Sequence, residues 1–273
     1  MNTRLKIFLI FCSCLILISS SCRIDRFPFY INGGIVDPNY PTILKPLTSA
    51  ELSQLQKEFN ELNDHKIQTQ LNKYGFTGKW DFSISHPNPD IPLSKSQAIN
   101  LAIQCIFKNK KFTNVNDTTL FRSSLIHSSK GNIEGTEWIL RFSPQVLKGY
   151  EVITNFIAVL LYGDGVYCIS GFWYPDIYIP EIDIISIDGA KQIISGQKII
   201  WYDIMGNPVE FIVSDDKIGN NIIKTIYPII ENDLTELRLT WKIPILFDDW
   251  VGWHIYVDTM TGEIISTIQE FRT

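Results

Sequence analysis

The chain has 273 residues, of which 45% are hydrophobic and 12% aromatic, with 24 Lys and Arg against 29 Asp and Glu. The net charge of −5 argues against nucleic acid as a partner, because such binding rests on a surplus of basic residues. The length suffices for one or two hydrophobic cores, and the composition is that of an ordinary globular protein.

The first residues have the layout of a secretory signal peptide. Arg4 and Lys6 precede an uncharged apolar run from Ile7 to Ile18, and three serines then lead to Cys22. The run is about a dozen residues long, shorter than the ~20 that a spanning helix needs. We expect residues 1–21 to be cleaved, which leaves 22 basic and 29 acidic residues in the mature chain.

The small residues before Cys22 resemble the lipobox of bacterial lipoproteins. The resemblance implies that Cys22 becomes the lipidated first residue, with palmitate among its acyl groups, and several acyl chains hold a protein at a membrane surface without a spanning helix. The alternative is cleavage near the same place with Cys22 as an ordinary thiol. We expect lipidation, and therefore an anchored lipoprotein of the bacterial cell envelope that faces the periplasm or the cell surface.

A tether and a short helical segment are expected next. Residues 22–47 contain four prolines and a Gly-Gly pair without regular spacing, which is typical of a linker. Within residues 48–92, Thr48 and Glu51 have the spacing of a capping box. One helix face then carries Leu52, Leu55, Phe59 and Leu62, and a short strand is expected at Trp80, Phe82 and Ile84.

The most informative pattern is an internal repeat of helix starts. The strings LSKSQAINLA, residues 93–102, and ISIDGAKQII, residues 185–194, align without a gap. Their serines, Ser94 and Ser186, are expected to cap the first turns, and Gln97 completes a capping box in the first copy. The alanine four residues after each serine, Ala98 or Ala190, is expected to face a sheet.

Strand-like runs follow each helix start. The first copy contains WILRF, IAVLLY and VYCIS (residues 138–142, 157–162 and 166–170), and the second contains LRLTWKI, HIYV and IISTI (residues 237–243, 254–257 and 264–268). The last two runs of each copy are expected to form a hairpin, through Gly163-Asp164-Gly165 or through DTMTGE, residues 258–263. An extra pair, IIWYDIM and VEFIV, lies in the second copy. Separate helix and hairpin runs indicate an α+β fold.

The second copy resembles the PepSY domain. The match rests on Ile-Ser-x-x-x-Ala at residues 185–190 and on Tyr-Val-Asp-x-x-Thr-Gly-Glu-Ile-Ile at residues 256–265. The first copy matches as a degenerate form that lacks the Asp-x-x-Thr-Gly-Glu turn. The resemblance implies two repeats of a helix packed on a small antiparallel sheet, at residues 93–180 and 181–273. It also implies a protein that inhibits or modulates a peptidase and is not itself an enzyme.

The string DTMTGE gathers acids and hydroxyls, as a calcium loop does. An EF-hand needs ligands at positions three, five and twelve, and counting from Asp258 these positions hold Met260, Gly262 and Gln269. A turn explains the string better, because Asp258 can accept turn amides and Gly262 can adopt a positive φ. We therefore expect a structural turn.

Motifs that would indicate a zinc, serine-nucleophile or dinucleotide site are not found in the sequence. The four histidines are scattered without zinc spacing, no GxSxG occurs, and Gly163-x-Gly165 leads into a strand where a dinucleotide site needs a helix. No catalytic residue, metal or cofactor is predicted. Outside the cytoplasm Cys105 and Cys168 can pair, but their apolar surroundings favour an interpretation as small buried side chains.

Aromatic residues gather in the second copy, in and around FDDWVGW, residues 247–253. Aromatic side chains are prominent in interfaces, but they also fill cores. We expect Trp241 in the core and Trp250 as an exposed contact with a partner.

The sequence thus predicts a non-catalytic envelope lipoprotein that binds or modulates a protein partner, with a peptidase as one candidate, through a sheet face or an edge strand. The first alternative is an envelope glycan-binding protein or enzyme whose site the spacing does not reveal. The second is a structural component of an envelope complex.

Overall fold

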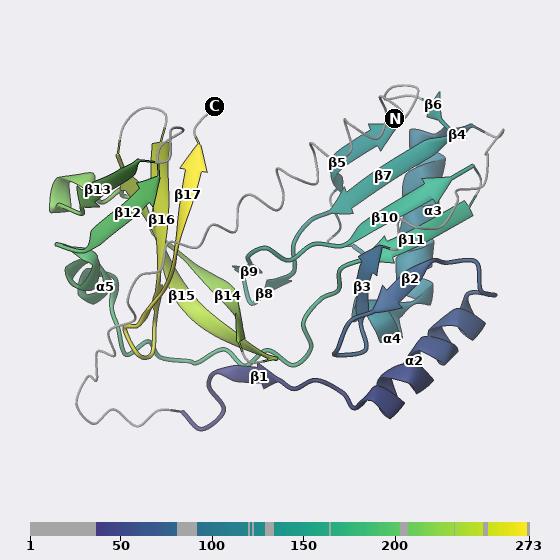
Figure 1. Cartoon of the computed structure of the whole chain (residues 1–273), viewed down its shortest axis with the longest axis horizontal. Helices are drawn as coiled ribbons and strands as arrows, with labels where there is room; N and C mark the ends of the chain where they lie inside the picture. Colours follow the sequence, from purple (N-terminus) through teal and green to yellow (C-terminus); the bar gives the residue numbers. More distant parts are fainter. Residues whose placement is uncertain are drawn as a thin grey trace. The chain divides into compact units, whose positions relative to one another are not determined.

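A computed structural model describes residues 37–80, 92–119, 121, 123–128, 134–163, 165–202, 207–231, 233–247 and 251–271 (Figure 1). The residues expected to form the signal peptide, Cys22, most of the expected tether and Trp250 lie outside these ranges. The chain divides into two compact units, each described here by itself. Of the described residues, the first unit contains those within 41–178 and 228–238, and the second contains those within 37–40, 179–227 and 239–271.

Helices and antiparallel strands occupy separate stretches of the chain, so the fold belongs to the mixed α+β class. The first unit contains three helices within the described ranges: α2 (Ser49–Leu62), α3 (Lys95–Lys108) and α4 (Lys110–Thr113). Its four-stranded sheet has the order β11-β10-β7-β5, formed by Gly165–Ser170, Ala158–Tyr162, Glu137–Phe142 and Ser123–Ser128.

Short pairs complete the first unit. They are β2 (Thr69–Leu71) with β3 (Thr77–Trp80), β4 (Leu93–Ser94) with β6 (Glu134–Gly135), and β8 (Val146–Leu147) with β9 (Tyr150–Val152); β1 (Thr42–Leu44) pairs with the start of β15 (Leu234–Leu246). The strand expected at Trp80, Phe82 and Ile84 ends at Trp80 in β3, and the other two residues lie outside the described ranges.

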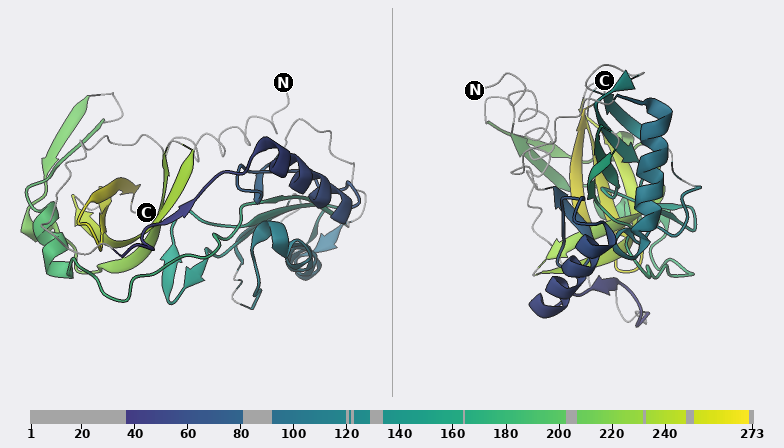
Figure 2. Two further views of the ribbon diagram at one scale, coloured as in Figure 1. Left: turned by 90° about the horizontal axis from the view of Figure 1, so that it is seen from below. Right: turned by 90° about the vertical axis from the view of Figure 1, so that its right-hand side faces the viewer.

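The core of the first unit lies between α3 and the four-stranded sheet (Figure 2). Alternate residues of β7 point into it, and Trp138, Leu140 and Phe142 are buried. Ala98 and Ala102 of α3 are fully buried against this face, as the pattern predicted for Ala98. A small side chain at these positions lets the helix backbone approach the strands.

Both capping boxes are confirmed. The hydroxyl of Thr48 accepts the Glu51 amide at the start of α2, and that of Ser94 accepts the Gln97 amide at the start of α3. Of the apolar residues on the predicted helix face, Phe59 is buried, whereas Leu62, the last residue of α2, is exposed. The side chain of the next residue, Asn63, is buried, and its Nδ2 donates to the Phe59 carbonyl at the end of the helix.

The outer edge of β11 is covered within the first unit. The Tyr167 carbonyl accepts the Gln68 amide at 2.7 Å, and the Thr69 hydroxyl both accepts the Ile169 amide and donates to the Ile169 carbonyl, each at 2.9 Å. A threonine side chain thus takes the role of a neighbouring strand.

The second unit is a strongly antiparallel structure with one described α-helix, α5 (Ile187–Ile194). Its strands follow the order β17-β16-β15-β14, formed by Ile264–Phe271, Val251–Asp258, Leu234–Leu246 and Ile223–Glu231; the last two are shared with the first unit. A separate hairpin pairs β12 (Lys198–Tyr202) with β13 (Pro208–Ile212), and a 3-10 turn spans Asp215–Lys217.

The core of the second unit lies between α5, the hairpin and one face of the sheet. Trp241 and Ile243 of β15 and Trp253 and Ile255 of β16 point into it at alternate positions. Ala190 of α5 is fully buried in the same cluster, as expected. The serine before α5, Ser186, accepts the Gly189 amide at 3.1 Å and so caps this helix as predicted.

Candidate functional site

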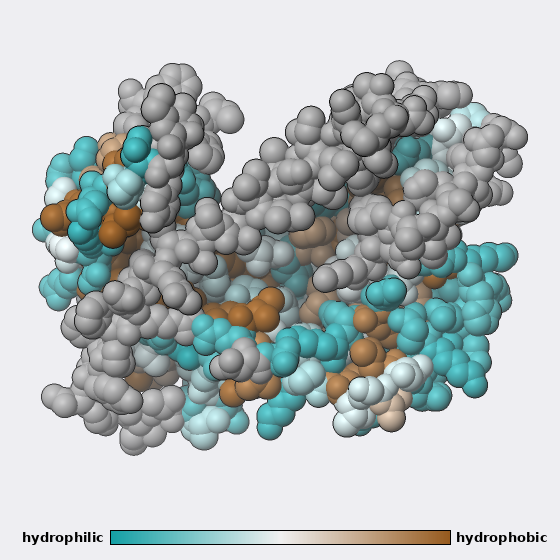
Figure 3. Space-filling model, viewed as in Figure 1, coloured by the Kyte–Doolittle hydropathy of each residue, from teal (hydrophilic) through white to brown (hydrophobic). Residues whose placement is uncertain are grey.

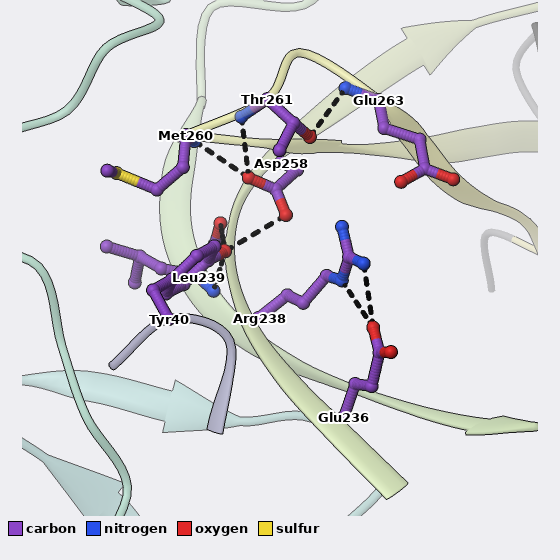
Figure 4. A network of polar contacts seen from close by, with 8 residues as sticks. All are labelled: Tyr40, Glu236, Arg238, Leu239, Asp258, Met260, Thr261 and Glu263. Carbon is purple, nitrogen blue, oxygen red and sulfur yellow. Dashed lines mark hydrogen bonds and ion pairs between the residues drawn. The ribbon is translucent and has the colours of Figure 1, made fainter. Parts of the chain in front are cut away.

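The closing turn of the second unit, residues 258–263, is a structural feature (Figure 4). The fully buried Asp258 accepts the Met260 and Thr261 amides at Oδ1, at 2.7 and 3.0 Å, and the hydroxyl of Tyr40 at Oδ2, at 3.0 Å. The Tyr40 hydroxyl also accepts the Leu239 amide at 3.0 Å. The carboxylate therefore satisfies turn amides and ties residue 40 to the sheet, which confirms the interpretation as a turn.

Gly262 fits this turn for two reasons. Its φ is +75°, a conformation that side chains disfavour, and a Cβ there would lie 3.0 Å from Cδ1 of Ile193 in α5. The turn is also tied to the residue before the Ser186 cap, because the Thr259 carbonyl accepts the Ile185 amide at 2.8 Å. The string that resembles the PepSY motif thus joins the hairpin to the helix.

The predicted aromatic positions are mostly interior. Trp241 is buried, as expected, and its indole N–H donates to the Ile185 carbonyl at 2.8 Å. Trp253 is buried beside Trp201, with ring centroids 5.5 Å apart, and Phe247 packs edge-on against Trp201 at 4.8 Å. Trp250 lies outside the described residues, so its exposure stays a prediction.

Cys105 and Cys168 are both free thiols. Burial raises the pKa of Cys105 to about 11 and that of Cys168 to about 12. Both thiols therefore stay protonated and unreactive at neutral pH, since the thiolate is the reactive form. The interpretation as small buried side chains is confirmed for Cys168, whereas Cys105 is only partly buried.

The strand register assembles a charged cluster that the sequence does not reveal. On the sheet face away from the core, Oε1 of Glu270 lies 2.8 Å from Nδ1 of His254 and 3.9 Å from Nζ of Lys242. The rings of Tyr256 and Tyr227 follow on the same side, with centroids 4.7 Å apart. Tyr256 is buried, so its ring face is not open to a ligand.

Within the described ranges, no three His, Cys, Asp or Glu side chains are placed to hold a metal ion together.

The β12–β13 hairpin presents two exposed apolar side chains. In its register Ile200 stands opposite Glu210, and Lys198 opposite Ile212. Ile212 is 63% exposed and Ile200 is 39% exposed, and Lys198 pairs diagonally with Glu210 at 2.6 Å. Figure 3 shows hydrophobic and hydrophilic surface intermixed over this hairpin, at the left. We call these four residues the hairpin face.

The side of the hairpin opposite the hairpin face packs in the core. The opposite side of the hairpin turns Ile199, Trp201 and Phe211 into the core, where Phe211 packs edge-on against Phe247 with centroids 5.2 Å apart. Side chains that alternate along a strand are thereby divided into an anchoring set and an exposed set. The exposed isoleucines therefore lie on a hairpin whose other side is anchored in the core.

These observations define an α+β protein whose candidate surface is suited to contact and whose acidic turn is structural. None of the helices that the structure describes is both long and apolar enough to cross a membrane. No protein-family model and no curated protein matches the chain. A solved structure, the Bacillus megaterium YpeB C-terminal domain, is similar over 84% of this chain and 100% of that chain, with 12% sequence identity and a TM-score of 0.32. This TM-score is too low to support a conclusion about the fold or the function of this chain.

Proposed function

We propose that the chain is a non-catalytic envelope lipoprotein, built of two PepSY-like units, that binds and modulates a protein partner. A peptidase is the first class to test, because that is what the PepSY resemblance implies. The observation that carries the proposal is the hairpin face, with two exposed isoleucines on a hairpin whose other side is anchored in the core.

A shared contact supports the repeat. In each unit the carbonyl of the residue before the capping serine accepts an indole N–H from a sheet strand. Trp138 donates to Leu93 at 3.2 Å in the first unit, and Trp241 donates to Ile185 at 2.8 Å in the second. Equivalent helix starts are thus held to equivalent strands by the same pair of groups.

The burial of three aromatic side chains in the described part of the second unit favours a protein partner over a glycan. Sugar recognition by an aromatic residue needs an open ring face. Trp241, Trp253 and Tyr256 are all less than one-tenth exposed. The exposed apolar groups on the hairpin are aliphatic, and aliphatic groups between opposite charges suit a protein surface of complementary pattern.

Affinity capture tests the contact. The full chain is used as bait in envelope extracts as wild type, Ile212→Glu and Ile230→Glu. Ile230 is the matched control, because this isoleucine is 68% exposed but lies outside the hairpin face. We expect Ile212→Glu to reduce recovery of the partner at least tenfold and Ile230→Glu to leave it unchanged. Recovery of a specific glycan by all three baits, with no protein, would overturn the proposal.

The anchor has its own test. Cells that express the chain are labelled with a fatty-acid precursor, as wild type and as Cys22→Ala. We expect label on the wild type and none on the variant, because Cys22 is the proposed site of acylation. Equal labelling of the two would contradict the anchor without touching the hairpin face.

A further inference from the structure

We propose that the edge strand β17 pairs with β17 of a second copy of this chain, so that the sheet continues across a two-fold axis. This inference goes beyond the proposed function, since it concerns a different surface and holds whether or not the hairpin face binds a partner. We identify the partner strand as a second β17, because the residues of β17 complement one another when two copies pair antiparallel.

The edge of β17 is long and carries few of the usual protections. β17 has eight residues and stands at the end of the strand order, with β16 as its one neighbour among the described strands. Its sequence, IISTIQEF, contains neither Lys nor Pro, the residues that commonly block an edge. By contrast, the β11 edge is covered through Thr69, and the edge strand β8 has two residues.

The register with β16 assigns each β17 residue to a face. Ser266, Ile268 and Glu270 stand opposite Tyr256, His254 and Gly252, on the face away from the core. Thr267 and Gln269 stand opposite the core residues Ile255 and Trp253. A second strand that continues the sheet must pair residues of the same face, so the allowed registers differ by steps of two.

One of these registers matches every polar residue with a polar one. When Ile268 faces Ile268 of the second copy, Ser266 faces Glu270 and Thr267 faces Gln269, on both sides of the axis. The two Glu270 carboxylates are then four residues apart, about 13 Å along the strand direction, so they do not oppose each other. Moving the centre to Thr267 places Ser266 against Ile268 and Glu270 against Ile264, which loses the match.

One side-chain atom has the capacity that this register uses. Glu270 meets His254 and Lys242 through Oε1 alone, which leaves Oε2 for the Ser266 hydroxyl opposite.

Cysteine cross-linking tests both the pairing and its register. The full-length chain is oxidised in membranes as Ser266→Cys alone, as Glu270→Cys alone and as the two coexpressed. Positions 266 and 270 face each other in the proposed register, whereas two copies of position 266 lie about 13 Å apart, too far for a disulfide. We expect at least tenfold more reducible dimer from coexpression than from either variant alone, with the wild-type chain as background.

A second variant separates pairing from random collision. Ile268→Lys, added to both cysteine chains, places two lysines opposite each other at the axis and should remove the cross-link. Ile212→Lys is the control and should keep it; circular dichroism and thermal unfolding verify that both variants fold. Equal dimer from the single-cysteine chains, a cross-link that survives Ile268→Lys, or no dimer in any preparation would overturn the proposal.

Discussion

At the scale of single residues, the acidic string near the end of the chain is explained by backbone demands. Asp258 is fully buried, and both of its carboxylate oxygens accept hydrogen bonds within the fold. The turn interpretation was accessible from the sequence, because Asp and Gly at these spacings serve local geometry. The contact with Tyr40 was not, since 218 positions separate the two residues.

We expect substitution of Gly262 to lower the stability of the fold, and Gly196 serves as a control for the part of this loss that comes from a positive φ. Gly262→Ala adds both a positive-φ penalty and a Cβ 3.0 Å from Ile193, whereas Gly196→Ala adds the φ penalty alone, because nothing lies within 4 Å of its Cβ position. We expect Gly196→Ala to cost about 1 kcal/mol and Gly262→Ala clearly more, seen as a larger fall in Tm by calorimetry. Equal falls would mean that the packing of the turn on α5 contributes nothing.

At the scale of elements, the sequence predicts helix starts from local signals, but it does not predict which residues of neighbouring strands stand opposite each other. The capping boxes at Thr48 and Ser94 were predicted because all their groups lie within four residues. The strand expected at residues 237–243 is longer in the structure, where β15 runs from Leu234 to Leu246, because its partner strands extend it. β14 was not predicted, and it contains Pro228, a residue type that argues against a central strand. The Lys242, His254 and Glu270 cluster needs the register of three strands, which no local pattern supplies.

The ends of α2 and α3 are joined by a buried pair of amides. Asn63 Nδ2 donates to Asn109 Oδ1 at 2.7 Å, and Asn109 Nδ2 donates back to Asn63 Oδ1 at 3.1 Å. Asn109→Ala leaves the buried Asn63 amide with unmet hydrogen-bonding capacity, so we expect a loss of about 1–3 kcal/mol. Thermal unfolding of the two single variants and the double variant should give a coupling energy of about 0.5–3 kcal/mol.

The control for this cycle is Asn155, whose amide donates to the Phe172 carbonyl and shares no partner with Asn63. The effects of Asn63→Ala and Asn155→Ala should add. Coupling as large in the control cycle as in the Asn63 and Asn109 cycle would show that the amide pair is not a specific link between the two helices.

At the scale of the whole molecule, each unit applies one arrangement: a serine-capped helix start, a buried alanine and a tryptophan bond to the residue before the cap. The sequence predicted the α+β class and both helix starts, because helical spacing and hairpin turns are local signals. Which side chains form the hairpin face depends on their burial, and the sequence pattern does not show it. Ile200 and Ile199 are neighbours of the same residue type, and only packing against the core decides which one is exposed.

Partner binding through the hairpin face is the central claim, and photo-cross-linking in living cells tests it most directly. A photoreactive residue is placed at position 212 and, as the control, at position 230. We predict a covalent adduct with one other envelope protein from position 212 and no such adduct from position 230. The same products from both positions, or no protein adduct from position 212, would contradict it.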